Sequence, residues 1–201
     1  MTILISTAYL PPISYMAACL DADEVLIEAQ ETYPKQTFRN RCCIYGPNGK
    51  QALIIPVRKP DGNHTKTKDI RLDSSVPWRK HHWRSFEAGY NKSPYFLYYK
   101  DDFQPFFHRQ YTFLIDFNTG LLETLFRMIR LEKKVKFTDR FEERSTEVED
   151  MRFTLSSKHQ QFEYPAYIQV FSSRHGFIPN LSVIDLLFNL GPEARNYLSS
   201  L

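Results

Sequence analysis

Glycine is scarce in this chain, with only seven among 201 residues. None of the seven stands in a G-x-G-x-x-G or G-x-x-x-x-G-K-[ST] spacing, and no G-x-S-x-G stretch occurs. The usual glycine-rich phosphate loops and the nucleophile elbow of α/β-hydrolases are therefore excluded. Long apolar runs are also missing: none approaches the roughly 18 residues of a transmembrane helix, so we expect no insertion into a membrane.

Cysteine is rarer still. The three residues Cys19, Cys42 and Cys43 are odd in number and two are adjacent, which makes a poor disulfide framework. The spacing of Cys and His fits no zinc pattern, so we expect no metal site, and the sequence leaves the cofactors unknown. The start of the sequence lacks the basic and apolar regions of a secretory signal. We therefore expect reduced structural thiols in a cytoplasmic protein.

The composition is that of a soluble globular protein, with 42% apolar and 24% charged residues, and it excludes disorder. The length suits a single domain spanning residues 1–201. The net charge of +3 is unevenly distributed, because residues 35–84 hold 12 Lys and Arg against three acids. This local charge of +9 leaves −6 for the rest of the chain and points to an anionic partner.

The first 30 residues read as strand, helix and strand. Residues 2–6 and 24–29 are apolar strand segments, and the helix between them enters through Pro11 and Pro12. Such a βαβ unit predicts parallel pairing, with the loop 7–11 at the carboxyl end of the sheet, where open α/β sheets bind ligands. We expect an α/β fold: a three-layer, mostly parallel, Rossmann-like sheet with a β-hairpin insertion and several helices.

Turn residues divide the rest of the chain. Gly46-Pro47-Asn48-Gly49 lies between two apolar runs and predicts a hairpin. A polar, mobile loop is expected over 60–68. Helical patterns cover 77–90 and 93–110, and a further helix could be capped by Asp116 or Asn118. The remaining expected elements are a short strand at 70–72, a strand at 167–171 and two short helices at 181–188 and 192–198.

The segment from Lys35 to Arg41 holds three cations in seven residues, namely Lys35, Arg39 and Arg41, together with Asn40. Arginine can grip a phosphate or carboxylate with two parallel hydrogen bonds, and lysine adds a mobile point charge. The segment therefore suits a small anionic ligand that carries phosphate or carboxylate. The alternative is that these charges are solvated, or that one arginine pairs with an acid elsewhere.

A second candidate is His82, which shares a helical face with Trp78 and lies next to Trp83. Histidine can act as a general acid or base near neutral pH, and a tryptophan beside it could stack a base or sugar. His81 points elsewhere. The competing interpretation is that His82 and the tryptophans belong to the core.

Several segments, in order along nearly the whole chain, resemble the WbqC-like family of bacterial proteins. The matching segments are the run from Tyr9 to Tyr15, Arg39-Asn40-Arg41, Ile54-Ile55-Pro56-Val57, the block from Trp78 to Phe96, Leu114 to Asn118 and Leu181 to Asn189. Two positions depart from the family pattern: Ser6-Thr7-Ala8 replaces a Gln-Pro-His or Gln-Pro-Asn stretch, and His81 replaces a lysine.

Members of this family occur in bacterial O-antigen and polysaccharide gene clusters, and a glycine-transferase role has been suggested for some. The resemblance thus implies a transferase that acts on an anionic, nucleotide-linked or aminoacyl substrate. In this interpretation the basic segment holds the anion and His82 is the general acid or base. The further ligand contacts would come from Tyr9, Trp83 and Tyr95.

Two other functions stay open. A non-catalytic structural or interaction protein would neutralise Arg39 and Arg41 with buried carboxylates, for which Asp116 and Asp185 are candidates. A nucleic-acid-binding module could use the same basic stretch, but the small overall charge and the acidic remainder oppose a phosphate backbone. Long nucleic acid is therefore not expected as a partner, and the number of subunits is left open.

Overall fold

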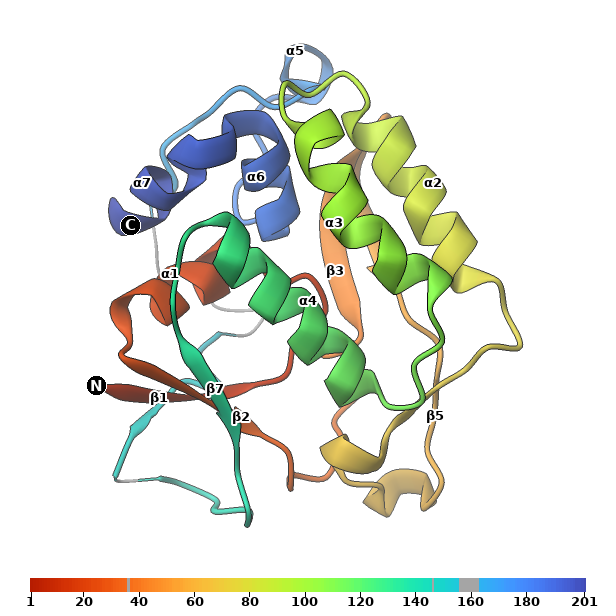
Figure 1. The fold of residues 1–201 in the computed structure, drawn as a ribbon, viewed down its shortest axis with the longest axis vertical. Helices are drawn as coiled ribbons and strands as arrows, with labels where there is room; N and C mark the ends of the chain where they lie inside the picture. The colour runs from red at the N-terminus through yellow and green to blue at the C-terminus, as the bar shows by residue number, and fades with distance from the viewer. Residues whose placement is uncertain (36, 146, 156–162) are drawn as a thin grey trace.

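The first two strands pair in parallel, as the βαβ pattern predicts. The computed structural model describes residues 1–35, 37–145, 147–155 and 163–201. Its main sheet has four parallel strands in the order β7-β2-β1-β8 (Figure 1). Their bounds are Thr2–Ser6 for β1, Glu24–Glu28 for β2, Lys134–Phe137 for β7 and Glu149–Asp150 for β8. The parallel sheet confirms the predicted α/β class.

The connection between β1 and β2 is the helix α1, Ile13–Asp21. Pro12 occupies its N-cap, where the absent N–H is no loss. The strand β1 is buried at its three central residues, and it pairs with β2 from Thr2 opposite Glu24 to Ser6 opposite Glu28. The ends of both strands consequently lie at one edge of the sheet, which positions the loops that follow them.

The predicted hairpin is confirmed as β3, Arg41–Gly46, and β4, Gly49–Ile54, which pair in antiparallel fashion. Pro47 and Asn48 lie between the two strands, and Gly49, the first residue of β4, has a positive φ of 95° that glycine adopts without strain.

A small antiparallel pair follows, β5 (Val57–Arg58) with β6 (Arg71–Leu72). The polar segment between these strands is more ordered than expected. It forms two 3-10 turns, and the side chains of Thr65 and Thr67 are buried.

The three long helices lie where the sequence predicts them, and they fill the upper right and centre of Figure 1. They are α2 (Trp78–Tyr90), α3 (Phe96–His108) and α4 (Leu114–Met128). The expected cap of α4 was wrong, because the helix begins before both candidates. Asn118 is instead buried inside α4, where its amide donates to Thr7 Oγ1 and to the carbonyl of Arg39.

The C-terminal part holds α5 (Ser172–His175), α6 (Val183–Leu190) and α7 (Ala194–Ser199). The strand expected at 167–171 is not formed. The side-chain amide of Gln169 takes the place of a strand partner, since it donates to the carbonyl of Ile178 and accepts from the Ile178 amide. The two predicted terminal helices are confirmed.

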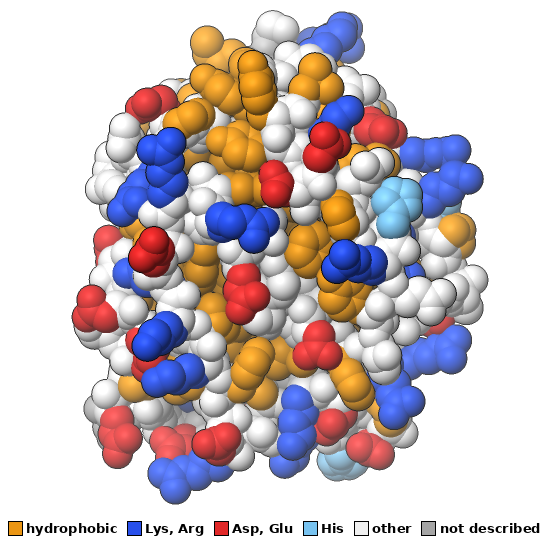
Figure 2. All heavy atoms as spheres, in the orientation of Figure 1, with side chains coloured by type: hydrophobic (Ala, Val, Ile, Leu, Met, Phe, Trp, Pro, Cys, Tyr) orange, Lys and Arg blue, Asp and Glu red, His pale blue; other side chains and the backbone are white. Residues whose placement is uncertain are grey.

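Aromatic rings from α2, α3, α4 and α6 form much of the core. Trp78 packs edge-on against Phe117, and Phe96 packs edge-on against Phe188, with ring centroids 5.6 and 5.1 Å apart. On the face drawn in Figure 2, acidic and basic side chains are mixed, with cations gathering toward the edge near α2 and β5. Among the described residues, no helix is both long and apolar enough to cross a bilayer.

Candidate ligand-binding cleft

A cavity of about 660 Å³ opens where β1 and β2 end, at the carboxyl edge of the sheet. One side is formed by the segments that follow these two strands, and the opposite side comes from the chain after β7. We call this cavity the β1–β2 cleft. It is lined by Ser6, Thr7, Ala8, Tyr15, Gln30, Glu31, Thr32, Pro34, Lys35, Thr37, Phe38, Arg39, Phe141, Met151, Arg152, Phe153 and Leu155. Its location agrees with the rule for open α/β sheets.

The charged wall of the cleft is built around Arg39, which is only 6% exposed. Its Nε donates to Glu31 Oε1 at 2.7 Å and its Nη2 donates to Glu31 Oε2 at 2.8 Å, so the pair is bidentate. Nη2 also donates to Ser6 Oγ, and Thr67 Oγ1 donates to Glu31 from the other side. Arg39 thus lines the cleft in a fixed orientation, with much of its charge balanced by Glu31.

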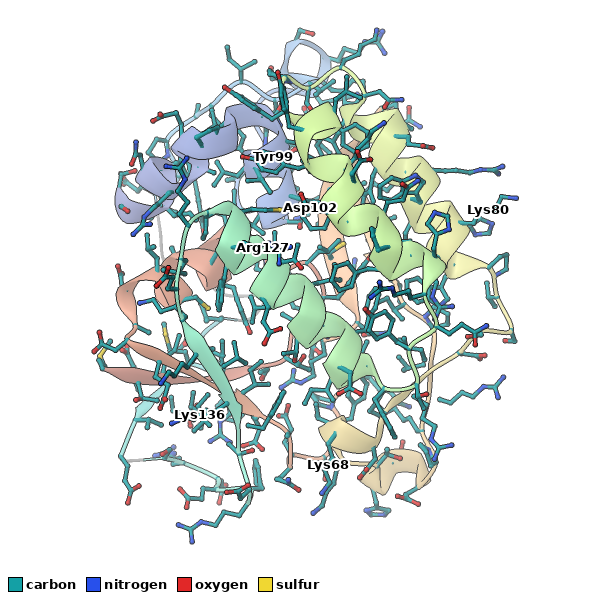
Figure 3. The ribbon with its side chains drawn as sticks, in the orientation of Figure 1. Lys68, Lys80, Tyr99, Asp102, Arg127 and Lys136 are labelled. Atoms are coloured by element: carbon teal, nitrogen blue, oxygen red, sulfur yellow. The ribbon has the colours of Figure 1, made fainter. Side chains whose placement is uncertain are left out.

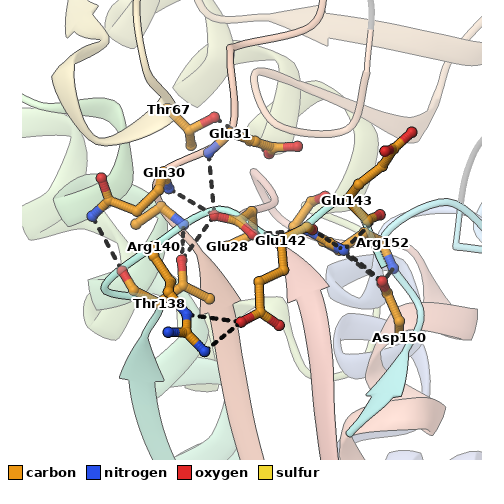
Figure 4. Close-up of polar contacts among 12 residues, drawn as sticks. Glu28, Gln30, Glu31, Thr67, Thr138, Arg140, Glu142, Glu143, Asp150 and Arg152 are labelled. Carbon is orange, nitrogen blue, oxygen red and sulfur yellow. Dashed lines mark hydrogen bonds and ion pairs between the residues drawn. The ribbon is translucent and has the colours of Figure 1, made fainter. Parts of the chain in front are cut away.

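The second buried arginine, Arg152, ties the far wall of the cleft to the end of β2 (Figure 4). Its Nη1 donates to Glu28 Oε2 at 2.8 Å, and its Nε donates to Asp150 Oδ1 at 2.9 Å. Its Nη2 donates to Asp150 and to the carbonyls of Glu142 and Glu143. Burial acts to raise the pKa of Asp150, but the hydrogen bonds from Arg152 outweigh it and hold that pKa below its ordinary value.

Glu28 completes this arrangement. Its Oε1 accepts from the backbone amides of Gln30 and Glu31 and from the hydroxyl of Thr138. One carboxylate therefore shapes the turn after β2 and also anchors Arg152. The glutamates of the two buried Arg–Glu pairs are three residues apart in the chain. Glu28 is the last residue of β2, and Glu31 lies in the segment that follows it.

The opposite wall of the cleft is apolar. The rings of Phe141 and Phe153 lie against the guanidinium of Arg152, with its Cζ 5.4 and 5.5 Å from their centroids. Both rings are also well exposed, at 48% and 61%, and Met151 continues the same wall. The cleft therefore offers a ligand one charged side and one apolar side.

The remaining cation of the cleft is Lys35, which is exposed at the rim. Within the part of the chain that the structure describes, no carboxylate forms an ion pair with it. Lys59 lies nearby over the ring of Tyr33, at 4.9 Å from its centroid. Burial and the charge of Lys35 both lower the pKa of Lys59, which marks this rim as positive.

The three residues of the Arg39-Asn40-Arg41 segment, a turn that leads into β3, have different surroundings. Arg39 lines the cleft, whereas the side chain of Asn40 donates to the carbonyl of Ile55 and joins the segment to the end of the hairpin. Arg41 lines a separate cavity of about 210 Å³. Gln36, which adds an amide to this stretch of sequence, lies outside the described residues.

Tyr9 and His82 lie together in the core, away from the cleft lining. The Tyr9 hydroxyl is 2.8 Å from His82 Nδ1, and Tyr9 is fully buried while His82 is 4% exposed. Burial lowers the pKa of His82 to about 4, and a hydrogen bond to the backbone of Ile54 does not outweigh it. His82 is therefore neutral near pH 7.

The other two residues expected at the site also lie elsewhere. Trp83 donates from Nε1 to Glu87 and packs against Phe107. Tyr95 donates its backbone amide to Phe188, next to Gly191. Of the predicted site residues, the structure thus brings Lys35 and Arg39 together in the cleft and places Arg41 beside it.

Comparison with known proteins now identifies the family. A model of the WbqC-like protein family matches residues 7–158 and 150–197. The chain belongs to the WbqC-like protein family. It is also similar to Rv1507c, an uncharacterized protein of Mycobacterium tuberculosis, with 28% identity over 222 aligned positions that cover 97% of this chain and 96% of the relative. No solved structure matches the chain.

Proposed function

We propose that this WbqC-like protein binds a small ligand with a phosphate or carboxylate group in the β1–β2 cleft. The observation that carries the proposal is the rim of the cleft, where exposed Lys35 and buried Arg39 line the same cavity. Arg39 is pre-oriented by Glu31 and Ser6, so a ligand need not immobilise it on binding.

The dimensions of the cleft support a small molecule rather than a polymer. Its volume of about 660 Å³ lies within the roughly 300–1,000 Å³ of small-molecule sites. The apolar wall of Phe141 and Phe153 would cover a ring or an acyl group of the ligand. The mixed charges on the face in Figure 2 do not favour a long phosphate backbone.

We further propose that the protein catalyses a transfer reaction in which the bound anion is the donor or the acceptor. The family resemblance implies such a transferase in surface-polysaccharide synthesis. In this reaction Lys35 and Arg39 bind and orient the anion. Tyr9 and His82 are buried outside the cleft lining and stabilise the core. Proton transfer by His82 would need a route to the cleft, because its ring is buried against Tyr9 and Trp78.

A second candidate is a non-catalytic interaction protein, and one observation favours it. Arg39 is paired with a buried carboxylate, as that interpretation requires, although the partner is Glu31 rather than Asp116 or Asp185. This alternative predicts that no small anion stabilises the protein. Arg41, by contrast, is exposed and lines a cavity, which agrees with a ligand.

A thermal-shift screen against nucleotides, nucleotide-sugars and aminoacyl compounds separates the two candidates. A ligand present at 100 times its Kd should stabilise the fold by about 2.7 kcal/mol. We expect the stabilisation by an anionic compound to shrink in Lys35→Gln and to persist in Lys68→Gln, a matched exposed lysine that does not line the cleft (Figure 3). Equal shifts in the two variants would contradict the proposed site, and the absence of any stabilising anion would favour the interaction protein.

A further inference from the structure

A second cavity adjoins the cleft. It has a volume of about 210 Å³ and shares Thr37 and Phe38 with the cleft lining. We call it the hairpin cavity, and its other lining residues are Leu10, Pro12, Arg41, Cys42, Cys43, Lys50, Asn180 and Ser182. The volume lies below the usual range of small-molecule pockets, so it suits one chemical group of a ligand rather than a whole ligand.

The charge of the hairpin cavity is strongly one-sided. The antiparallel register puts Arg41, Cys43 and Lys50 on one face of the hairpin, because Cys43 follows Arg41 by two residues and Lys50 lies opposite Tyr45. Arg41 and Lys50 are both exposed, and they flank Cys43 along this face. None of the described residues that line the cavity carries a carboxylate, so these residues do not balance the two cations.

Two helices also begin at this cavity. Pro12 is the N-cap of α1 and Ser182 is the N-cap of α6, and both line the cavity. The first amides of both helices are already bonded. In α1, Ile13 N donates to the carbonyl of Leu181 and Ser14 N donates to Asn180 Oδ1, and in α6, Val183 N donates to the carbonyl of Pro11. The helix dipoles add positive potential, but the direct contacts to an anion would come from Arg41 and Lys50.

The backbone around the cavity is held in uncommon conformations. Leu10 and Asn180 have φ values of 41° and 52°, and both line the cavity. A leucine in the left-handed region is strained, and such residues cluster at ligand sites and active sites. The side chain of Leu10 is buried, so packing holds this strain in place beside the two cations.

We propose that the hairpin cavity is an anion subsite that takes a second phosphate or carboxylate group of the ligand bound in the β1–β2 cleft. The inference rests on the proposed function, and it narrows the ligand to a molecule with two separated anionic groups. Such a ligand would cross Thr37 and Phe38, the wall that both cavities share. Lys35 would hold one group and Arg41 with Lys50 would hold the other.

The test is a titration of the ¹⁵N-labelled protein with inorganic phosphate, followed by NMR. We expect the largest shifts at the amides of Arg41, Cys43, Lys50 and Ser182. Loss of one charge-assisted contact should weaken phosphate binding about tenfold in Arg41→Gln and in Lys50→Gln. Lys80→Gln, an exposed lysine on α2 labelled in Figure 3, is the control and should bind like the wild type.

Two outcomes would overturn the subsite: phosphate shifts that leave the hairpin amides unmoved, or equal affinity in Arg41→Gln, Lys50→Gln and Lys80→Gln. The failure of the proposed function has a different signature. If the best compound of the thermal-shift screen loses affinity in Lys35→Gln but not in Arg41→Gln, the cleft stands and the subsite falls. If phosphate still moves the hairpin amides while Lys35→Gln has no effect on that compound, the cleft falls, and the hairpin cavity stands as an anion site but not as a subsite of the cleft.

Discussion

Arg39 and Glu31 meet through two parallel hydrogen bonds of 2.7 and 2.8 Å, and each side chain is less than a tenth exposed. The pair lies at the wall of the β1–β2 cleft, eight residues apart along the loop that follows β2. It closes this loop onto itself and presents a guanidinium edge to the cavity. The fold of this loop and the proposed ligand site therefore depend on the same two side chains.

Removing one partner of this ion pair should destabilise the protein more than removing both. We expect Glu31→Leu to lower the free energy of unfolding by about 3–5 kcal/mol, because the charge of Arg39 stays buried without its partner. The double variant Glu31→Leu with Arg39→Met should recover a large part of the loss. Denaturant unfolding of the single and double variants measures the coupling. Single variants within 1 kcal/mol of the wild type would contradict the account.

Arg152 should hold the far wall of the cleft in place. Arg152→Met removes its hydrogen bonds to Glu28, to Asp150 and to the carbonyls of Glu142 and Glu143, so residues 139–145 should open more readily. We expect trypsin to cleave first after the exposed residues Arg140 and Arg144, several-fold faster than in the wild type.

The control for this experiment is Arg127→Gln. Arg127 is exposed and pairs with Asp102 at 3.5 Å on the helical side of the molecule (Figure 3), where a surface pair contributes about 0–1 kcal/mol. If Arg152→Met and Arg127→Gln are cleaved at the same rate and at the same sites, the anchoring role of Arg152 is wrong.

His82 should make stability depend on pH. Its pKa is about 4 in the folded chain against an ordinary 6.5, so between these values the unfolded state binds the extra proton. Stability therefore falls as the pH drops from 7 to 4, by about 3 kcal/mol from this residue. His82→Gln should flatten the dependence in urea unfolding, whereas His81→Gln on the exposed side should retain it. Identical slopes in all three proteins would refute the assignment.

The close approach of the Tyr95 ring to Gly191 should make the stability of the protein sensitive to substitution of this glycine. A Cβ at Gly191 would come within 2.5 Å of the Tyr95 ring, and Gly191 also has a positive φ of 56°. Gly191→Ala should therefore cost more than the roughly 1–3 kcal/mol of backbone strain alone. Gly176→Ala is the matched control, because Gly176 has a φ of 73° but open space around it. Equal losses of thermal stability would show that Tyr95 does not crowd Gly191.

Local sequence signals predicted the parts of the fold that are contiguous in the chain. Two proline residues and two apolar runs located β1, α1 and β2, and the Gly46–Gly49 turn located the hairpin. The same signals predicted that the loop 7–11 lies at the carboxyl end of the sheet, and in the structure Lys35 and Arg39 line a cavity together with Thr7 and Ala8 of that loop.

The sequence did not predict the contacts between residues that are far apart in the chain. β7 is a charged four-residue strand, Lys134–Phe137, which pairs with β2 more than 100 residues earlier. Arg152 and Glu28 are 124 residues apart, and no spacing links them. The two buried carboxylates near the cleft belong to Glu28, the last residue of β2, and to Glu31 three residues later, and neither was identified from the sequence.

The most direct test of the account is calorimetric titration of the best anionic compound from the screen into the wild type, Lys35→Gln and Lys68→Gln. Loss of one charge contact of about 1–2 kcal/mol at the rim predicts a 5- to 30-fold weaker Kd for Lys35→Gln. Lys68→Gln should bind the compound with the same Kd as the wild type. Equal Kd values for all three proteins would contradict a ligand site in the β1–β2 cleft.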